Sequence, residues 1–267
     1  FTCSLLQRDD QRKILLRIVV IEAAAANLGS MATPIGNPQN LYLYSTYSFS
    51  LETFFKTILP IVGISYIGLL FSLLLIPQQP LAAEIPTESH LPLSAQKKNL
   101  IIYSILGVVC LATVAGFVTH VICFCVVLLG MIVTDRALIR RVDWELLLTF
   151  VCFFLFSGNL QQIEPVRNLM MQGLSGGVCL TAALVSQVIS NVPAAVLLSG
   201  FTEQGKELLL GVDIGGLGTP IASLASLIAY QYYAKSRLAN PAKYLQFFFI
   251  YQFIGLFLLL AVKFILL

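Results

Sequence analysis

Long stretches of this chain contain almost no charged residues, and the charged residues gather in short segments between them. The low-charge stretches cover residues 57–76, 100–134, 146–160, 173–202 and 244–267. A helix that crosses a bilayer needs about 20 mainly apolar residues. Several stretches reach that length, so the pattern predicts an all-α integral membrane protein with many spans.

Clusters of Gly, Pro and polar residues interrupt three of the predicted apolar helices. These clusters lie at residues 29–38, 190–193 and 215–223. Gly and Pro at this density end a helix. We therefore expect four elements, which are a first broken helix over 14–47, a re-entrant hairpin over 169–200 with its tip at the second cluster, a second broken helix over 208–233, and a last span over 245–267.

The predicted order of spans and hairpin assigns each loop to one side of the membrane. The Lys and Arg residues are divided unevenly between the two sides. Twelve of the 16 fall on one side, which includes the connection 77–98, and the other four are Lys56, Arg167, Lys206 and Lys263. Cytoplasmic loops carry the excess of Lys and Arg, so the richer side is predicted to be cytoplasmic. A hairpin that crossed the membrane completely would invert the later loops and destroy this agreement.

The two broken helices repeat each other in sequence. A shift of 186 residues places 27–47 over 213–233, with seven of 21 positions identical, and Thr33-Pro34-Ile35 falls on Thr219-Pro220-Ile221. The first copy enters the membrane from the cytoplasm and the second from outside, which is typical of an inverted-topology repeat. We divide the chain into the remainder of a first repeat (1–76), a cytoplasmic connection (77–98) and a second repeat (99–267).

A span and a hairpin precede the second copy, whereas only a short charged segment precedes the first. We therefore expect the sequence to be N-terminally incomplete, with the hairpin of the first repeat lying upstream.

The three interruptions predict helix N-termini that face one region. Thr33 and Thr219 are expected to be N-caps followed by proline, and the second hairpin arm is expected to begin after Ser190-Asn191, with Pro193 early in it. Helix N-termini suit an anion. Na⁺ is bound by oxygen atoms, which the side chains of Thr33, Asn37, Ser190, Asn191, Thr219 and Ser223 can supply. The alternative is that these small polar residues only permit close helix packing. We expect the tip to lie within about 20 Å of the second break, or two helix diameters, and the first break at similar depth.

Two acidic residues lie within the predicted helices. Asp213 takes the repeat position of Asn27, beside the second break, and is a candidate proton or cation site because intramembrane carboxylates are costly and usually functional. For Glu22 we prefer a pairing with a basic residue near the cytoplasmic edge, such as Arg17.

Composition excludes several classes of function. Charged residues make up 11% of the chain, against roughly 25% in soluble domains. The net charge of +3, without a basic arm, argues against nucleic-acid binding. The six cysteines show no spacing typical of a metal site or a disulfide framework. We expect no cofactor, and no metal beyond a coupling Na⁺.

Segments 25–40, 190–194 and 215–223 resemble the ion transporter superfamily, which includes arsenite permeases, sodium/proton antiporters and citrate-transporter-like proteins. The sequence is most similar to the citrate-transporter-like anion permeases of bacterial membranes. The resemblance implies inverted repeats that each contain a hairpin and a broken helix, elevator-type movement, a multi-pass location in the bacterial inner membrane and often a homodimer. Carried over position by position, it implies a site made of Thr33, Pro34, Gly36, Asn37, Ser190, Asn191, Pro193, Gly218, Thr219 and Ser223.

The leading hypothesis is secondary active transport of a small anion or oxyanion, coupled to Na⁺ or H⁺. An arsenite or antimonite efflux permease and a Na⁺/H⁺ antiporter are the alternatives within transport. An intramembrane enzyme is a remote alternative, because the sequence has no HExxH motif, nucleophile motif or aspartyl pair. A channel fits inverted broken helices less well than alternating access does.

The predicted topology can be tested by accessibility labelling in the full-length protein. Single cysteines at positions 78 and 140 should react only from the cytoplasm, and one at position 203 only from outside. Labelling of positions 140 and 203 from the same side would contradict both the hairpin and the inverted repeat.

Overall fold

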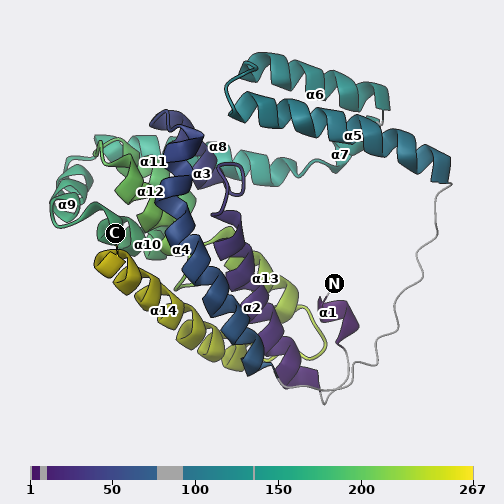
Figure 1. The fold of residues 1–267 in the computed structure, drawn as a ribbon. Coiled ribbons are helices and arrows are strands. Elements are labelled where there is room, and N and C mark those ends of the chain that lie inside the picture. The colour runs from purple at the N-terminus through teal and green to yellow at the C-terminus, as the bar shows by residue number, and fades with distance from the viewer. Residues whose placement is uncertain (1, 7–10, 77–92, 135, 267) are drawn as a thin grey trace. The chain divides into compact units, whose positions relative to one another are not determined.

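The computed structural model describes residues 2–6, 11–76, 93–134 and 136–266. Within these ranges the chain is helical, with turns and short bends but no strand (Figure 1). The prediction of an all-α protein is therefore confirmed. The predicted cytoplasmic connection 77–98 lies mostly outside the described residues, and its last part, from Leu93, belongs to a helix.

The chain divides into two compact units, Phe1–Glu84 with Cys152–Leu267, and Ile85–Val151. In the second unit, α5 (Leu93–Val114) packs against α6 (His120–Thr134), and the short α7 (Arg136–Arg141) follows. The turn between α5 and α6 contains Gly116, which has a φ of 84° that suits glycine. These helices correspond to two of the predicted spans.

The first broken helix consists of α2 (Arg12–Ser30), an irregular turn, and α3 (Pro38–Thr46). Before it lies the short α1 (Thr2–Leu5), and after it come α4 (Leu51–Ser72) and the 3₁₀ helix η2 (Leu73–Leu75). Asn37, and not Thr33, is the N-cap of α3, and its side-chain oxygen accepts a hydrogen bond from the Asn40 amide over 2.8 Å. The prediction that a helix restarts after Thr33 is wrong, because residues 33–36 form a turn closed by the Gly36 amide on the Thr33 carbonyl (3.1 Å).

The second broken helix has the same local structure. It consists of α12 (Gly205–Ile214) and α13 (Leu224–Ala234), and α14 (Pro241–Leu266) follows. Ser223, not Thr219, is the N-cap, and its hydroxyl accepts a bond from the Ser226 amide. The Ala222 amide donates to the Thr219 carbonyl over 3.1 Å. Each of these positions lies 186 residues after its counterpart in the first break, so the N-cap and the turn before it recur at equivalent positions of the sequence repeat.

The hairpin in the structure is shorter than the predicted hairpin over 169–200. Its two arms are α10 (Val178–Ile189) and α11 (Asn191–Ser199), which pack against each other. Residues 169–175 belong to a separate helix, α9 (Glu164–Ser175), which follows α8 (Trp144–Gln162) at a bend of 91°. Gly176 and Gly177 separate α9 from α10, and Gly177 has a φ of 139°.

Ser190 joins the two hairpin arms in a backbone conformation that other residues avoid. Its φ of 75° and ψ of 154° lie in a region occupied almost only by glycine. A serine held there costs on the order of 1–3 kcal/mol. Contacts elsewhere must therefore stabilise the tip.

Two described helices are individually long and apolar enough to cross a membrane, α4 and α14. The bent pair of α8 and α9 would also be long and apolar enough if the two helices form one span. The apolar parts of α5, α6 and α10 are shorter. The first unit is built around α12, in which every residue from Leu208 to Ile214 is buried. Helices α10, α11 and α3 pack on α12, while α13 and α14 pack on α2 (Figure 1).

Gly36 provides a test of the first break. A Cβ atom at this position would lie 1.8 Å from the Ser30 carbonyl oxygen. Because that oxygen belongs to the backbone, Gly36→Ala should displace the break and lower the stability of the protein by about 1–3 kcal/mol, the usual range for overpacking. Gly63→Ala is the matched control, because nothing lies within 4 Å of its added Cβ. Thermal unfolding in detergent measures both variants, and equal midpoints would contradict the close approach at Gly36.

Candidate functional site

The hairpin tip contacts the second break directly. The Asn191 amide donates to the Ala222 carbonyl over 2.9 Å, and the Ser190 hydroxyl lies 3.4 Å from the same oxygen. The tip and the second break are therefore well within the separation expected from the sequence. Ser190 is the residue before α11 but makes no capping bond with its side chain, and Asn191 is the first residue of that helix.

Asp213 joins the first break to the second broken helix. Its carboxyl lies in the last turn of α12 and is 2% exposed. Asn37 Nδ2 donates to Asp213 Oδ1 over 3.2 Å, and Gln39 Nε2 donates to the same oxygen over 3.3 Å. Asn37 therefore caps α3 with its oxygen and binds the carboxylate with its nitrogen. The N-terminus of α3 lies beside the only acidic residue of the two breaks and the tip.

Two asparagines meet over the backbone of Gly216 in the second break. A Cβ atom at Gly216 would lie 2.5 Å from Asn27 Nδ2 and 2.9 Å from Asn191 Nδ2. The absence of a side chain at Gly216 therefore lets both amides approach the break. Asn27 is the repeat counterpart of Asp213. We call the region where the two breaks and the hairpin tip contact one another the junction.

The side chain of Gln187 holds the first hairpin arm against the second break. Its Nε2 lies within hydrogen-bond distance of the Gly215 and Leu217 carbonyls (2.7 and 3.0 Å). Its Oε1 accepts a bond from the Thr219 amide over 2.9 Å, and the Thr219 hydroxyl donates to the Gln187 carbonyl over 3.0 Å. A Cβ atom at Gly218 would collide with Gln187, and Gly218 has a φ of 109°. One glutamine thus pairs backbone groups that the break leaves outside any helix.

Three buried side-chain atoms of this junction have no hydrogen-bond partner in the described part of the chain. They are Asp213 Oδ2, Asn40 Oδ1 and Asn27 Nδ2. The Asn40 amide nitrogen already donates to the Met31 and Thr33 carbonyls, which fixes the orientation of its side chain. Leaving buried polar atoms unpaired is costly. Two of these atoms are acceptors, which suit a cation or a proton, and the third is a donor, which suits an anion.

The structure brings together most of the residues that the sequence analysis proposed. Ser190, Asn191, Asn37, Ser223 and Asp213 lie at the junction or cap its helices. Thr33 takes part through its carbonyl, and Pro34 lies in the turn after it. Pro193 lies inside α11, where its carbonyl accepts a bond from the Ser157 hydroxyl of α8 (3.2 Å). The Thr219 hydroxyl donates to the Gln187 carbonyl, so Thr219 holds the second break against the first hairpin arm.

Sequence reasoning did not propose Gln39, Asn40 or Gln187 as site residues. Gln39 and Asn40 follow the N-cap of α3, and Gln187 lies three residues before the tip. Their proximity to the breaks is the signal that could have found them.

Glu22 has its hydrogen bond outside this junction. It accepts a hydrogen bond from the Thr2 hydroxyl over 2.6 Å and is exposed. The guanidinium of Arg17 lies 5.9 Å from the ring centre of Phe247.

Comparisons with known proteins agree with the transporter interpretation. Residues 3–203 match the citrate transporter family. The inner membrane protein YbiR of Escherichia coli is 32% identical over 236 residues, which are 85% of this chain and 59% of that protein. The uncharacterized transporter MJ0456 of Methanocaldococcus jannaschii is 32% identical over 216 residues (81% and 58%). The 46 kDa membrane protein of Mycobacterium leprae is 26% identical over 249 residues (79% and 58%).

This chain spans less than two thirds of the length of these relatives. The family match nevertheless extends over most of the chain and includes the first break and the hairpin tip. The resemblance found in the sequence motifs is confirmed, and the chain belongs to the citrate transporter family, whose relatives here are membrane proteins and transporters.

Proposed function

We propose that the protein is a secondary active transporter of a small anion or oxyanion, coupled to Na⁺ or H⁺ and working by alternating access. The observation that carries this proposal is the set of unpartnered buried atoms where the two broken helices and the hairpin tip meet. Broken helices in a membrane are tolerated where they line a cavity or bind a ligand. Two acceptors and one donor in one junction support the binding of ions of both signs.

The cation would bind near Asp213 and Asn40. Asp213 Oδ2 and Asn40 Oδ1 are both acceptors without a partner among the described residues. Na⁺ takes oxygen ligands of this kind, and a proton on Asp213 would supply the missing donor. Asn37 and Gln39 hold the other carboxylate oxygen, so the carboxyl group is already oriented.

The anion would bind near Asn27, Asn191 and the N-termini of the half-helices. No Lys or Arg lies in residues 27–40, 187–193 or 213–226. The negative charge of a substrate must therefore be offset by helix N-termini and by a cation bound beside it. This requirement gives a physical reason for coupling. The family description favours a carboxylate such as citrate as the anion.

The remaining parts of the proposal follow from the family. They are an inverted repeat with a re-entrant hairpin, elevator-type movement, a homodimer, and a location in the cell membrane. The buried carboxyl of Asp213 also favours a second candidate, a Na⁺/H⁺ antiporter, in which the same residue would exchange the two cations.

Uptake into membrane vesicles that contain the full-length protein tests the proposed function. Citrate, succinate, sulfate and arsenite should be offered in turn, with a Na⁺ gradient, a pH gradient or neither. We expect one anion to accumulate only when one of the gradients is imposed. Accumulation of none of them, together with Na⁺-driven proton movement, would favour the antiporter.

Replacement of Asp213 tests the cation site. Asp213→Asn keeps the size of the side chain but removes its charge, so the apparent affinity for the coupling cation should fall at least about tenfold, which corresponds to 1.4 kcal/mol. Glu207→Gln is the matched control, because Glu207 lies on the same helix but pairs with Lys263 of α14. It should leave the cation dependence unchanged. Unaltered cation dependence in Asp213→Asn would show that this carboxyl does not bind the coupling ion.

A further inference from the structure

Two thiols of the second compact unit face each other across the contact between α5 and α6. The sulfur atoms of Cys110 on α5 and Cys123 on α6 lie 3.9 Å apart. Both are free thiols in the structure, and Cys110 is exposed while Cys123 is partly buried. The sequence did not reveal this pair, because 12 residues separate the two positions and the spacing matches no metal or disulfide motif.

The helical register places both cysteines on the faces through which α5 and α6 pack. Leu106, Cys110 and Thr113 follow one another at spacings of four and three residues, so they share one face of α5. Cys123 and Gly130 are two helical turns apart and share one face of α6. A Cβ atom at Gly130 would lie 2.9 Å from Leu106 Cδ2, so these two faces are in contact. The cysteines therefore meet in the packed seam between the helices.

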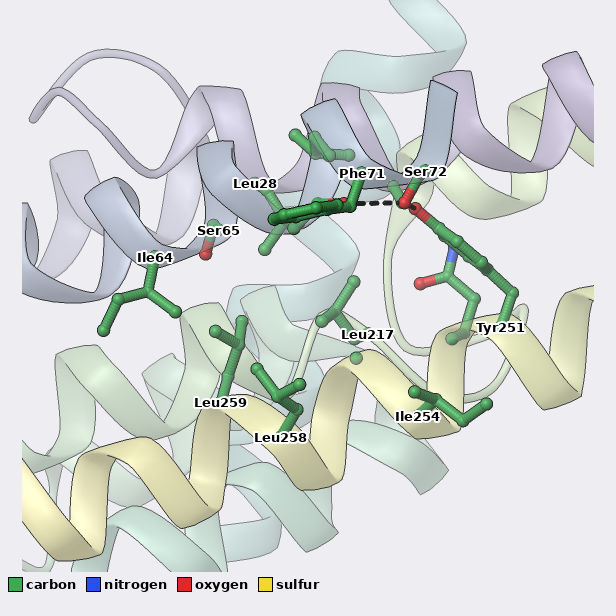
Figure 2. Close-up of a pocket in the computed structure, with 15 residues that line it drawn as sticks. Leu28, Ile64, Ser65, Phe71, Ser72, Leu217, Tyr251, Ile254, Leu258 and Leu259 are labelled. Atoms are coloured by element: carbon green, nitrogen blue, oxygen red, sulfur yellow. Dashed lines mark hydrogen bonds between the residues drawn. The ribbon is translucent and has the colours of Figure 1, made fainter. Parts of the chain in front are cut away.

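As thiols, these two side chains add little to the contact between the helices. An S–H group is a weak hydrogen-bond donor and a weak acceptor. Where α4 meets α14, by contrast, the hydroxyls of Ser72 and Tyr251 lie 2.6 Å apart and form a full hydrogen bond (Figure 2). Helices in lipid associate through packing and hydrogen bonds, without a hydrophobic driving force between them. A covalent bond between the two sulfur atoms would join α5 to α6 far more firmly than the thiols do.

The geometry of the pair allows such a bond. A disulfide requires the two sulfur atoms to approach to bonding distance, which rotation of the two side chains about their Cα–Cβ bonds can provide. The backbones already approach closely, because Gly130 has no side chain to hold them apart. Only the turn between α5 and α6 lies between the two cysteines and the helix ends, so closing the bond leaves the rest of the chain in place.

The predicted topology places the pair near the outer surface of the membrane. The connection before α5 and the basic helix α7, with Arg140 and Arg141, are predicted to be cytoplasmic, so the turn between α5 and α6 is predicted to face outside. Cys110 lies four residues before the end of α5, and Cys123 lies in the first turn of α6. Both are thus within about 6 Å of the turn along the helix axis. Disulfides form and persist outside the cytoplasm and are rare within it.

We infer that Cys110 and Cys123 are a modification site at which an intramolecular disulfide forms, with an exposed protein disulfide of the outer compartment as the oxidant. The thiolate of one cysteine attacks a sulfur of the oxidant and forms a mixed disulfide. The thiolate of the other cysteine then attacks the sulfur of the first, which forms the Cys110–Cys123 bond and releases the oxidant as a dithiol. The two protons and two electrons that the cysteines lose are both taken up by the oxidant. The inference rests on the predicted topology and is independent of the transported substrate.

Disulfide mapping in the full-length protein tests this site. Cells are quenched in acid, which stops thiol–disulfide exchange, and free thiols are alkylated in denaturant before digestion with chymotrypsin. Cleavage after Phe117 separates Cys110 from Cys123, and cleavage after Phe124 separates Cys123 from Cys125. We expect the peptides of Cys110 and Cys123 to be joined and to separate on reduction. Cys125, which is exposed on the same helix, should carry the alkyl group.

Two variants and one host strain separate this disulfide from accidental oxidation. Cys110→Ser should leave Cys123 alkylated, because its partner is gone. Cys125→Ser is the matched control and should retain the joined peptides. Reductant should lower the thermal unfolding midpoint of Cys125→Ser but not that of Cys110→Ser, since only the former has a cross-link to lose. Cells without the thiol oxidase of the outer compartment should yield both cysteines alkylated.

Alkylation of both Cys110 and Cys123 in the unmodified protein from cells that have the oxidase would overturn the inference. A joined peptide that contains Cys125 instead of Cys123 would show that the pairing is wrong. Joined peptides that persist in cells without the oxidase would contradict the assigned oxidant. All three results come from the unmodified chain, so the decision does not depend on whether a variant folds.

Discussion

Backbone amides and carbonyls freed by a break in a helix must find partners when little water is present, and this requirement organises the whole junction. Asn40 pairs the carbonyls of Met31 and Thr33, and Gln187 pairs those of Gly215 and Leu217. Asn37 and Ser223 cap the half-helices that follow. Carboxamide and hydroxyl side chains thus replace the hydrogen bonds that continuous helices would have made.

The same arrangement explains why the junction can serve as a binding site. Most polar groups of the junction already pair with the backbone or with each other, and the three buried atoms without a partner belong to α2, α3 and α12. They come from segments far apart in the sequence, so their distance from one another depends on the packing of α2 and α3 against α12. Rigid packing and ligand binding therefore depend on the same residues.

The sequence was sufficient to locate the breaks, their repeat and the buried carboxyl of Asp213, because Gly-Pro clusters and isolated acids stand out in apolar segments. It was not sufficient to place the caps. Thr-Pro is a common helix start, yet the Thr33 turn closes on Gly36, where only glycine fits, and the helix begins later. The start of the hairpin was missed because residues 169–175, the last part of α9, are as free of charge as α10, which follows the Gly176-Gly177 pair. The partners of Gln187 could not be found from local pattern, since they lie about thirty residues away.

Several hydrogen bonds of Gln187, Asn191 and Thr219 join residues 187–191 to residues 215–222. A force that pulls the tip from the break loads these bonds in parallel, so they must rupture together and not one after another. Parallel bonds of this kind make a structure stiff and its opening strongly cooperative. The tip and the second break should therefore be displaced as a single mechanical element, and thermal fluctuations should rarely separate them.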